Sequence, residues 1–173
     1  ALPICKFDSS PLPADTLSQL EDFISGLKPL LSDVKLKHKI VSGSEVKGMA
    51  LPKAPHYLLI FGKKHPLRDT AAGFLYQHAE LWLYAQGFAT RWLAGVKPKE
   101  ADPDYIIGIA FGKPAVPTVR RPEEFKRKPL EEIERGVDSR LEAARLAPSG
   151  KNGQPWYFIV DGSRVYTYCR TGS

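Results

Sequence analysis

The densest group of side chains that could bind a ligand lies in the segment APSGKNGQPWYFIV, residues 147–160. The hydroxyl of Ser149 and the amides of Asn152 and Gln154 can both donate and accept hydrogen bonds. Gly150 lies between them and adds backbone freedom. Such residues can simply satisfy a buried turn, or they can form a loop that lies against a flat polar ligand. The residues alone leave both interpretations open.

A second candidate group is the basic run RRPEEFKRK, in which Lys126, Arg127 and Lys128 precede Pro129. Such a run is most often a solvated face, but its cations could also bind a phosphate. The formal net charge is +6, yet the basic residues are spread out. They are not interleaved with aromatic side chains as in a groove for single-stranded nucleic acid. We therefore expect an anion of phosphate size, and no nucleic acid, as the partner.

Motifs for other chemistries are missing from the sequence. The stretch SGKNG lacks the phosphate-loop form Gly-x-x-x-x-Gly-Lys-Ser/Thr, and a predicted helix precedes it rather than a strand. The sequence has no His-Glu-x-x-His or Cys-x-x-Cys spacing for a metal and no Gly-x-Ser-x-Gly nucleophile motif. His78 lies in a largely apolar helix and is expected to be a core histidine. We predict no catalytic side chain and no metal, so that a cofactor would supply the chemistry.

Residues 11–27 (PLPADTLSQLEDFISGL) predict the first helix that supports these groups, because apolar side chains recur there at helical spacing. Thr16 with Gln19 predicts a capping box, and Asp15 could also cap the helix. The following stretch, to residue 53, is mixed and predicts a short strand and a loop.

Residues 69–87 predict a second and longer helix. Asp69 or Thr70 could cap it, and Gly87 could end it. The segment is apolar over much of its circumference, so we expect a central helix rather than a surface helix. The predicted apolar face consists of Phe74, Leu75, Leu81, Trp82 and Ala85.

Three further patterns predict β-structure. PHYLLIFG (55–62) and DYIIGIAFG (104–112) are nearly continuous apolar runs, as in buried strands. WYFIV and RVYTYC flank the turn signal DGS and predict a hairpin. GFATRWLAG (87–95) predicts a tight connection, and PLEEIERG and DSRLEAARLA predict short helices, the first with Pro129 at its first position. The elements mix without strict alternation, which favours an α+β fold over a doubly wound parallel sheet.

Length and composition favour one ordinary globular domain over residues 1–173. No apolar run reaches the length of a membrane span, so no membrane partner is expected. The opening ALPICKFDSS lacks the pattern of a signal peptide. Cys5 and Cys169 provide no disulfide framework. The simplest expectation is a cytoplasmic protein.

Several of these segments together resemble the nitroreductase family. APSGKNGQPWYFIV resembles its A-P-S-x-x-N-x-Q-P-W-x-F segment, and GFLYQHAELWLYAQGFATRWLAG resembles its central helix followed by a G-L-G-T-x-W-x-x-G turn. YIIGIAFGKP resembles its later strand, FKRKPLEE its K-x-R-x-P-L-E-E segment, and ICKFDSSPLP the end of its R-R-S-x-R-x-F opening. The order of the segments resembles a branch with two fused half-related repeats. Residues 1–135 would be the first repeat and 136–173 the start of the second, which usually continues with another helix and strand.

The resemblance implies a mixed or antiparallel central sheet flanked by helices around a long central helix. It also implies an FMN-dependent oxidoreductase that takes hydride from NADH or NADPH and reduces a nitroaromatic, quinone or similar small-molecule acceptor by a ping-pong scheme. Two subunits share each flavin in ordinary members, so a homodimer is one expectation, although a fused chain could supply both sides. The residues that the resemblance assigns to FMN are Cys5, Lys6, Trp92, Leu93, Ala94, Gly95, Lys126, Arg127, Lys128, Pro148, Ser149, Gly150, Asn152 and Gln154.

Within that set, residues 126–128 would bind the phosphate, residues 92–95 would pass the N5 edge of the ring, and residues 148–154 would face the ring. The rings of Trp92 and Trp156 are expected in the core in any case. The opening departs from the family, because ALPICKF replaces R-R-S-x-R-x-F. Lys6 could replace one cation, but Cys5 cannot. Each lost charge-assisted hydrogen bond is worth about 1.5–3 kcal/mol. The alternative is therefore a non-catalytic relative with weak or lost flavin binding that acts as a binding module.

Overall fold

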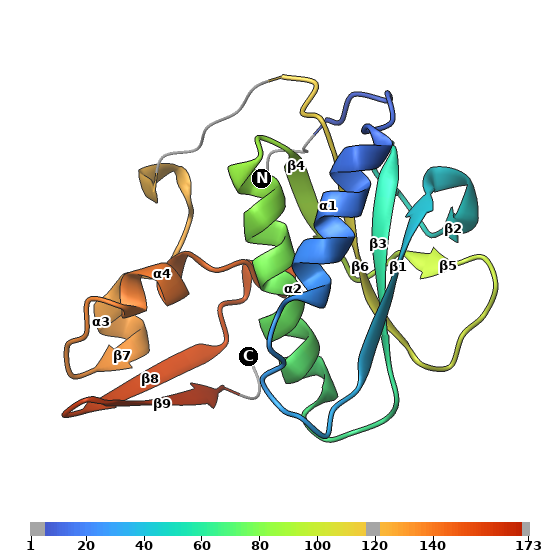
Figure 1. Ribbon diagram of the computed structural model, residues 1–173. Helices are drawn as coiled ribbons and strands as arrows, with labels where there is room; N and C mark the ends of the chain where they lie inside the picture. The colour runs from blue at the N-terminus through green and yellow to red at the C-terminus, as the bar shows by residue number, and fades with distance from the viewer. Residues whose placement is uncertain (1–5, 117–121, 171–173) are drawn as a thin grey trace. The chain divides into compact units, whose positions relative to one another are not determined.

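The computed structural model describes residues 6–116 and 122–170. The chain divides into two compact units, Ala1–Thr118 and Val119–Ser173. Each unit combines helices with a sheet (Figure 1), which confirms the predicted α+β class. The division into repeats at residues 135 and 136 stays a prediction.

The first unit is built on a four-stranded antiparallel sheet with the order β1-β3-β6-β4. Its strands are β1 (Leu36–Ser42), β3 (His56–Gly62), β4 (Ala89–Leu93) and β6 (Tyr105–Gly112). Every residue of β3 is buried, as its continuous apolar sequence predicts for a strand covered on both faces. The two predicted apolar strands are therefore confirmed, and they pair with each other at the centre of the sheet.

The tight connection predicted for residues 87–95 is wrong, because β4 occupies most of it. This strand pairs with β6 from Ala89 opposite Gly112 to Leu93 opposite Gly108. Gly87, with φ +83°, forms the turn that leads into the strand. The small residues around it suggested a loop, but Thr90 and Trp92 favour extended backbone, and β6 offers a free edge.

Two helices cover one face of this sheet (Figure 1), α1 (Ala14–Ser25) and α2 (Arg68–Ala85). Leu20 of α1 and Tyr76 and Leu83 of α2 pack with Leu58 and Phe111 of the central strands. The opposite face forms a second cluster, covered in part by the short pair β2 (Val46–Lys47) and β5 (Lys97–Pro98). A 3-10 turn, Gly43–Glu45, precedes β2.

The predicted starts of both helices are wrong. The N-cap of α1 is Pro13 and that of α2 is Leu67, and neither makes a side-chain capping bond. Pro13 has the φ of −55° that suits a helix start, so α1 begins before Thr16 can cap it. In α2, Asp69 lies in the first turn, where its negative carboxylate interacts favourably with the positive end of the helix dipole.

The predicted apolar face of α2 is correct only in part, because Leu75 and Trp82 pack against the core while the other predicted residues are exposed. Phe74 and Leu81 are 42% and 56% exposed. The buried side is instead rich in small residues, because alanines let the helix lie close to the sheet. The buried residues of α2 are Ala71, Ala72, Tyr76, Ala79 and Leu83.

The second unit has a three-stranded sheet with the order β7-β8-β9. Its strands are β7 (Glu134–Arg135), β8 (Trp156–Asp161) and β9 (Arg164–Cys169), and its helical elements are η2 (Pro122–Glu124), α3 (Leu130–Ile133), α4 (Leu141–Leu146) and η3 (Gly150–Asn152). The predicted hairpin is confirmed, since β8 and β9 pair antiparallel around Gly162, which has φ +57°. Ile133, Leu141 and Phe158 form the core of this unit.

Candidate functional site

The predicted cofactor-binding residues fall into separate groups in the two units. Lys6 and residues 92–95 belong to the first unit, and residues 126–128 and 148–154 belong to the second. Cys5 lies outside the described residues.

Lys6 lies beside the segment that follows β6. Its carbonyl accepts a hydrogen bond from the N–H of Ala115 at 2.8 Å, and Asp8 N–H donates to Lys113 O at 2.9 Å. Phe7 forms a bridge with Pro114 between these bonds. The Lys6 side chain itself is exposed, so its ammonium group is accessible to an anion.

Residues 92–95 form the end of β4 and the turn after it. Trp92 is half-buried and packs against the core, and Leu93 is 9% exposed. The ring of Trp92 is thus a core group, as expected. Ala94 and Gly95 are exposed, and a Cβ built on Gly95 would meet no atom within 4 Å. The backbone of this turn is therefore open to close approach by a flat ligand.

In the second unit, Asn152 joins the loop 148–154 to the basic segment 126–128. Its Oδ1 accepts a hydrogen bond from Arg127 Nη1 at 2.5 Å, and its Nδ2 donates to the carbonyl of Lys126 at 2.8 Å. Arg127 Nη2 also donates to the carbonyl of Leu146 at 3.3 Å. Both ends of the Asn152 amide are thus engaged with the segment that the sequence predicts to bind phosphate.

Gln154 makes a second set of bonds between the same segments. It is only 5% exposed. Its Oε1 accepts from the backbone N–H of Lys128 at 2.7 Å, and its Nε2 donates to the carbonyl of Asn152 at 3.0 Å. Its own N–H donates to Ser149 Oγ at 3.0 Å. We call the bonded group of Lys126, Arg127, Lys128, Asn152 and Gln154 the amide clamp.

The loop in the amide clamp has an unusual backbone. Lys151, Asn152 and Gln154 have φ values of 52°, 57° and 49°. This left-handed conformation costs a non-glycine residue about 1–2 kcal/mol, less for asparagine. A net hydrogen bond contributes about 0.5–1.5 kcal/mol, more when one partner is charged. The bonds of the amide clamp therefore offset the backbone strain and hold one loop conformation.

The two lysine side chains of the amide clamp are more exposed than the amide of Gln154. Lys126 is exposed and Lys128 half-buried. Neither Nζ makes a salt bridge among residues 6–116 and 122–170. Gly150, in the same loop, has open space where a Cβ would be. Ammonium groups of this kind can form charge-assisted hydrogen bonds with a phosphate, whereas the amides of Asn152 and Gln154 are already bonded within the protein.

Arg145 is a supporting residue that the sequence analysis missed. It lies in α4, and its Nη1 is 3.5 Å from the carbonyl of Lys128. Two bonds to Glu142, at 2.6 and 2.7 Å, fix its guanidinium, and the same hydrogen bonding lowers the pKa of Glu142. The spacing of Glu142 and Arg145 predicts their ion pair, but nothing in the sequence points to Lys128.

His78 and His56 each have a hydrogen-bond partner within the protein. His78 is exposed and its Nδ1 donates to the carbonyl of Phe74 at 2.8 Å, so the core position predicted for it is wrong. His56 is the buried one; it accepts the N–H of Leu12 at 2.9 Å, and burial lowers its pKa. No three of the His, Cys, Asp and Glu side chains within the described ranges lie together as a metal site would require.

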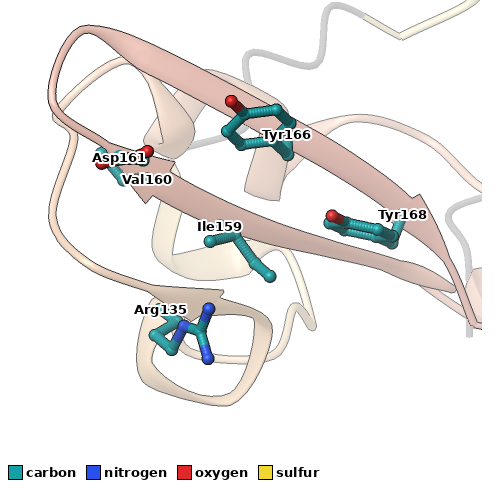
Figure 2. Close-up of a pocket in the computed structure, with 6 residues that line it drawn as sticks. All are labelled: Arg135, Ile159, Val160, Asp161, Tyr166 and Tyr168. Atoms are coloured by element: carbon teal, nitrogen blue, oxygen red, sulfur yellow. The ribbon is translucent and has the colours of Figure 1, made fainter.

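A surface hollow of about 390 Å³ lies elsewhere in the second unit. Figure 2 shows Tyr166 and Tyr168 along β9, Ile159 on the neighbouring strand β8, and Arg135 on β7 at the other side of β8. None of the residues predicted to bind cofactor lines this hollow, which is bounded by Arg135, Ile159, Val160, Asp161, Tyr166 and Tyr168.

Comparison with known proteins identifies the fold. The family model described as "Putative TM nitroreductase" matches residues 3–173. A Thermotoga maritima protein whose crystal structure is described as that of "a putative nitroreductase" superposes with a TM-score of 0.68 at 24% identity, over 95% of this chain and 70% of that chain. A nitroreductase family protein of Clostridium difficile superposes with a TM-score of 0.59 at 16% identity, over 75% of this chain and 89% of that one. No curated protein matched the sequence.

None of the described helices is both long and apolar enough to cross a membrane.

The solved structures share the mixed α+β architecture at low sequence identity, so they support the fold, and the family model supports membership of the family. Since that model covers almost the whole chain, the chain belongs to the nitroreductase family of oxidoreductases.

Proposed function

We propose that this protein is an FMN-dependent NAD(P)H oxidoreductase that reduces nitroaromatic, quinone or similar acceptors. The observation that carries the proposal is the amide clamp, which joins the two segments whose sequences most resemble the flavin-binding segments of the family. When bound, FMN would accept hydride from the nicotinamide and pass electrons to the acceptor.

The chain's own residues would bind and orient the cofactor. Lys126 and Lys128 would hold its phosphate, since ammonium groups form charge-assisted hydrogen bonds with phosphate oxygens. The open backbone at Gly150 would permit contact with a flat ring. The choice of NADH or NADPH, the cytoplasmic location and a homodimer are parts of the same proposal.

A second candidate is a non-catalytic relative that binds other molecules and has weak or lost flavin binding. The observation that favours it is that the amides of Asn152 and Gln154 are satisfied inside the protein. The opening segment also supplies Lys6 where the family has arginines.

An FMN titration with paired lysine variants separates these candidates. Replacing Lys126 and Lys128 together by alanine should weaken FMN binding by about 10- to 100-fold, because each lost phosphate contact costs about 1.4 kcal/mol, or a factor of ten. The matched control is K63A/K64A, which removes two exposed lysines of the first unit. It should leave the FMN dissociation constant within about twofold, because neither lysine is among the residues assigned to FMN and an exposed charge contributes little.

Equal effects of the two double variants would contradict the phosphate role of the amide clamp and point to general charge attraction. Tight FMN binding without oxidation of NADH or NADPH in the presence of a quinone would contradict the oxidoreductase and favour the binding module.

A further inference from the structure

Gln154 is the most buried polar residue among those predicted to contact the cofactor, at 5% exposure. Its side-chain amide has one bond on each end, to Lys128 N–H at 2.7 Å and to the carbonyl of Asn152 at 3.0 Å. A buried amide that is satisfied on both ends has little capacity left for a ligand. Its position instead links two segments that are 26 residues apart in sequence.

Gln154 accepts its hydrogen bond from the backbone N–H of Lys128, whose own side chain is half-buried. Lys128 belongs to an irregular stretch between η2 and α3, so no helix or strand fixes its backbone. Gln154 supplies the missing partner for its N–H. Two residues earlier in both segments, Asn152 Nδ2 donates to the carbonyl of Lys126. The direction in which both lysine side chains leave the chain is therefore set by the loop 148–154.

We propose that Gln154 is a positioning residue, which fixes the backbone of Lys128 so that the lysines of the amide clamp converge on the cofactor phosphate. This inference rests on the proposed function for its ligand, but the clamp itself is independent of any ligand. It replaces the direct contact with the flavin ring that the sequence resemblance implies for Gln154.

The test compares FMN with riboflavin, which has the same ring and lacks the phosphate. In Gln154→Met, which keeps the side-chain length and removes both hydrogen bonds, the FMN dissociation constant should rise about tenfold, the effect of one lost charged hydrogen bond. Riboflavin binding should change less than about twofold by the same reasoning. The matched control is Gln77→Met in α2, where Gln77 also bonds a neighbouring side chain, that of Glu80. It should alter neither affinity.

Loss of FMN and riboflavin binding by equal factors would overturn the proposal. It would mean that the substitution disturbs the whole loop rather than the contacts to the phosphate, which only FMN has. Unchanged binding of both flavins would overturn it too. Amide hydrogen exchange of the unmodified protein provides a test that needs no variant. The Lys128 amide should exchange at least tenfold more slowly than an unprotected amide, and exchange at the unprotected rate would overturn the clamp. Binding of neither flavin by the unmodified chain, with Lys128 protected, would instead overturn the proposed function.

Discussion

The hydrogen bond between Arg127 and Asn152 should contribute measurably to the stability of the second unit. Their Nη1–Oδ1 distance is 2.5 Å, and the bond is partly buried. A hydrogen bond with one charged partner is worth about 1.5–3 kcal/mol. Both side chains are only half-buried, so we expect a coupling free energy of about 1.5 kcal/mol, at the lower end of that range.

A double-mutant cycle isolates this bond from the other contacts of the two residues. Arg127→Met also removes the bond to Leu146 O and the cation–π contact with Phe125. Asn152→Ala also removes the bond to Lys126 O and places alanine at φ 57°. These additional losses occur equally in the single and double variants, so they cancel in the coupling free energy.

The assay is chemical denaturation of the four proteins, with the free energy of unfolding extrapolated to water. A control cycle pairs Arg127→Met with Tyr166→Phe on β9, whose effects should add within about 0.5 kcal/mol. Additive effects of the Arg127 and Asn152 substitutions would refute the reasoning, since they would mean that the two side chains do not stabilise each other.

Two further perturbations test other parts of the structure. Gly136 and Gly162 both have left-handed backbone, but a Cβ on Gly136 would lie 2.8 Å from the Cβ of Val160, whereas a Cβ on Gly162 would meet nothing within 4 Å. Gly162→Ala should cost about 1–2 kcal/mol for backbone strain alone, and Gly136→Ala at least about 1 kcal/mol more for overpacking; equal unfolding free energies would show that Val160 does not crowd Gly136. Burial raises the pKa of Tyr105 from 10.0 to about 12. Between these two pH values the Tyr105 hydroxyl therefore stays protonated in the folded state and is deprotonated in the unfolded state. The free energy of unfolding should therefore fall as pH rises from 10 to 12, and Tyr105→Phe should reduce that slope; an unchanged slope in urea titrations across this range would contradict the assignment.

Much of the fold could be predicted from local sequence. The runs around β3 and β6 are apolar throughout, as strands covered on both faces require, and the DGS signal between β8 and β9 predicts their hairpin. The strand β4 could not be predicted in this way, because its partner β6 follows later in the chain and only the pairing makes the strand. The burial of α2 depends on alanines whose importance comes from the sheet beneath them.

The candidate site also depends on contacts between distant segments, which local sequence does not reveal. The family resemblance points to Asn152 and Gln154, and the structure brings both together with residues 126–128. What the sequence could not predict is the direction of these amides, which bond the protein's own backbone rather than leaving a free face. That arrangement requires the approach of two segments that are 26 residues apart, and no local pattern encodes such an approach.

The central claim is that this chain binds FMN and reduces it with a nicotinamide cofactor. The most direct measurement is the visible absorbance spectrum of the purified protein after incubation with FMN and desalting, before and after addition of NADH or NADPH. The account predicts a retained flavin spectrum that bleaches on addition of one of these reductants. A folded protein that retains no flavin after loading would contradict the claim and leave the binding module as the function.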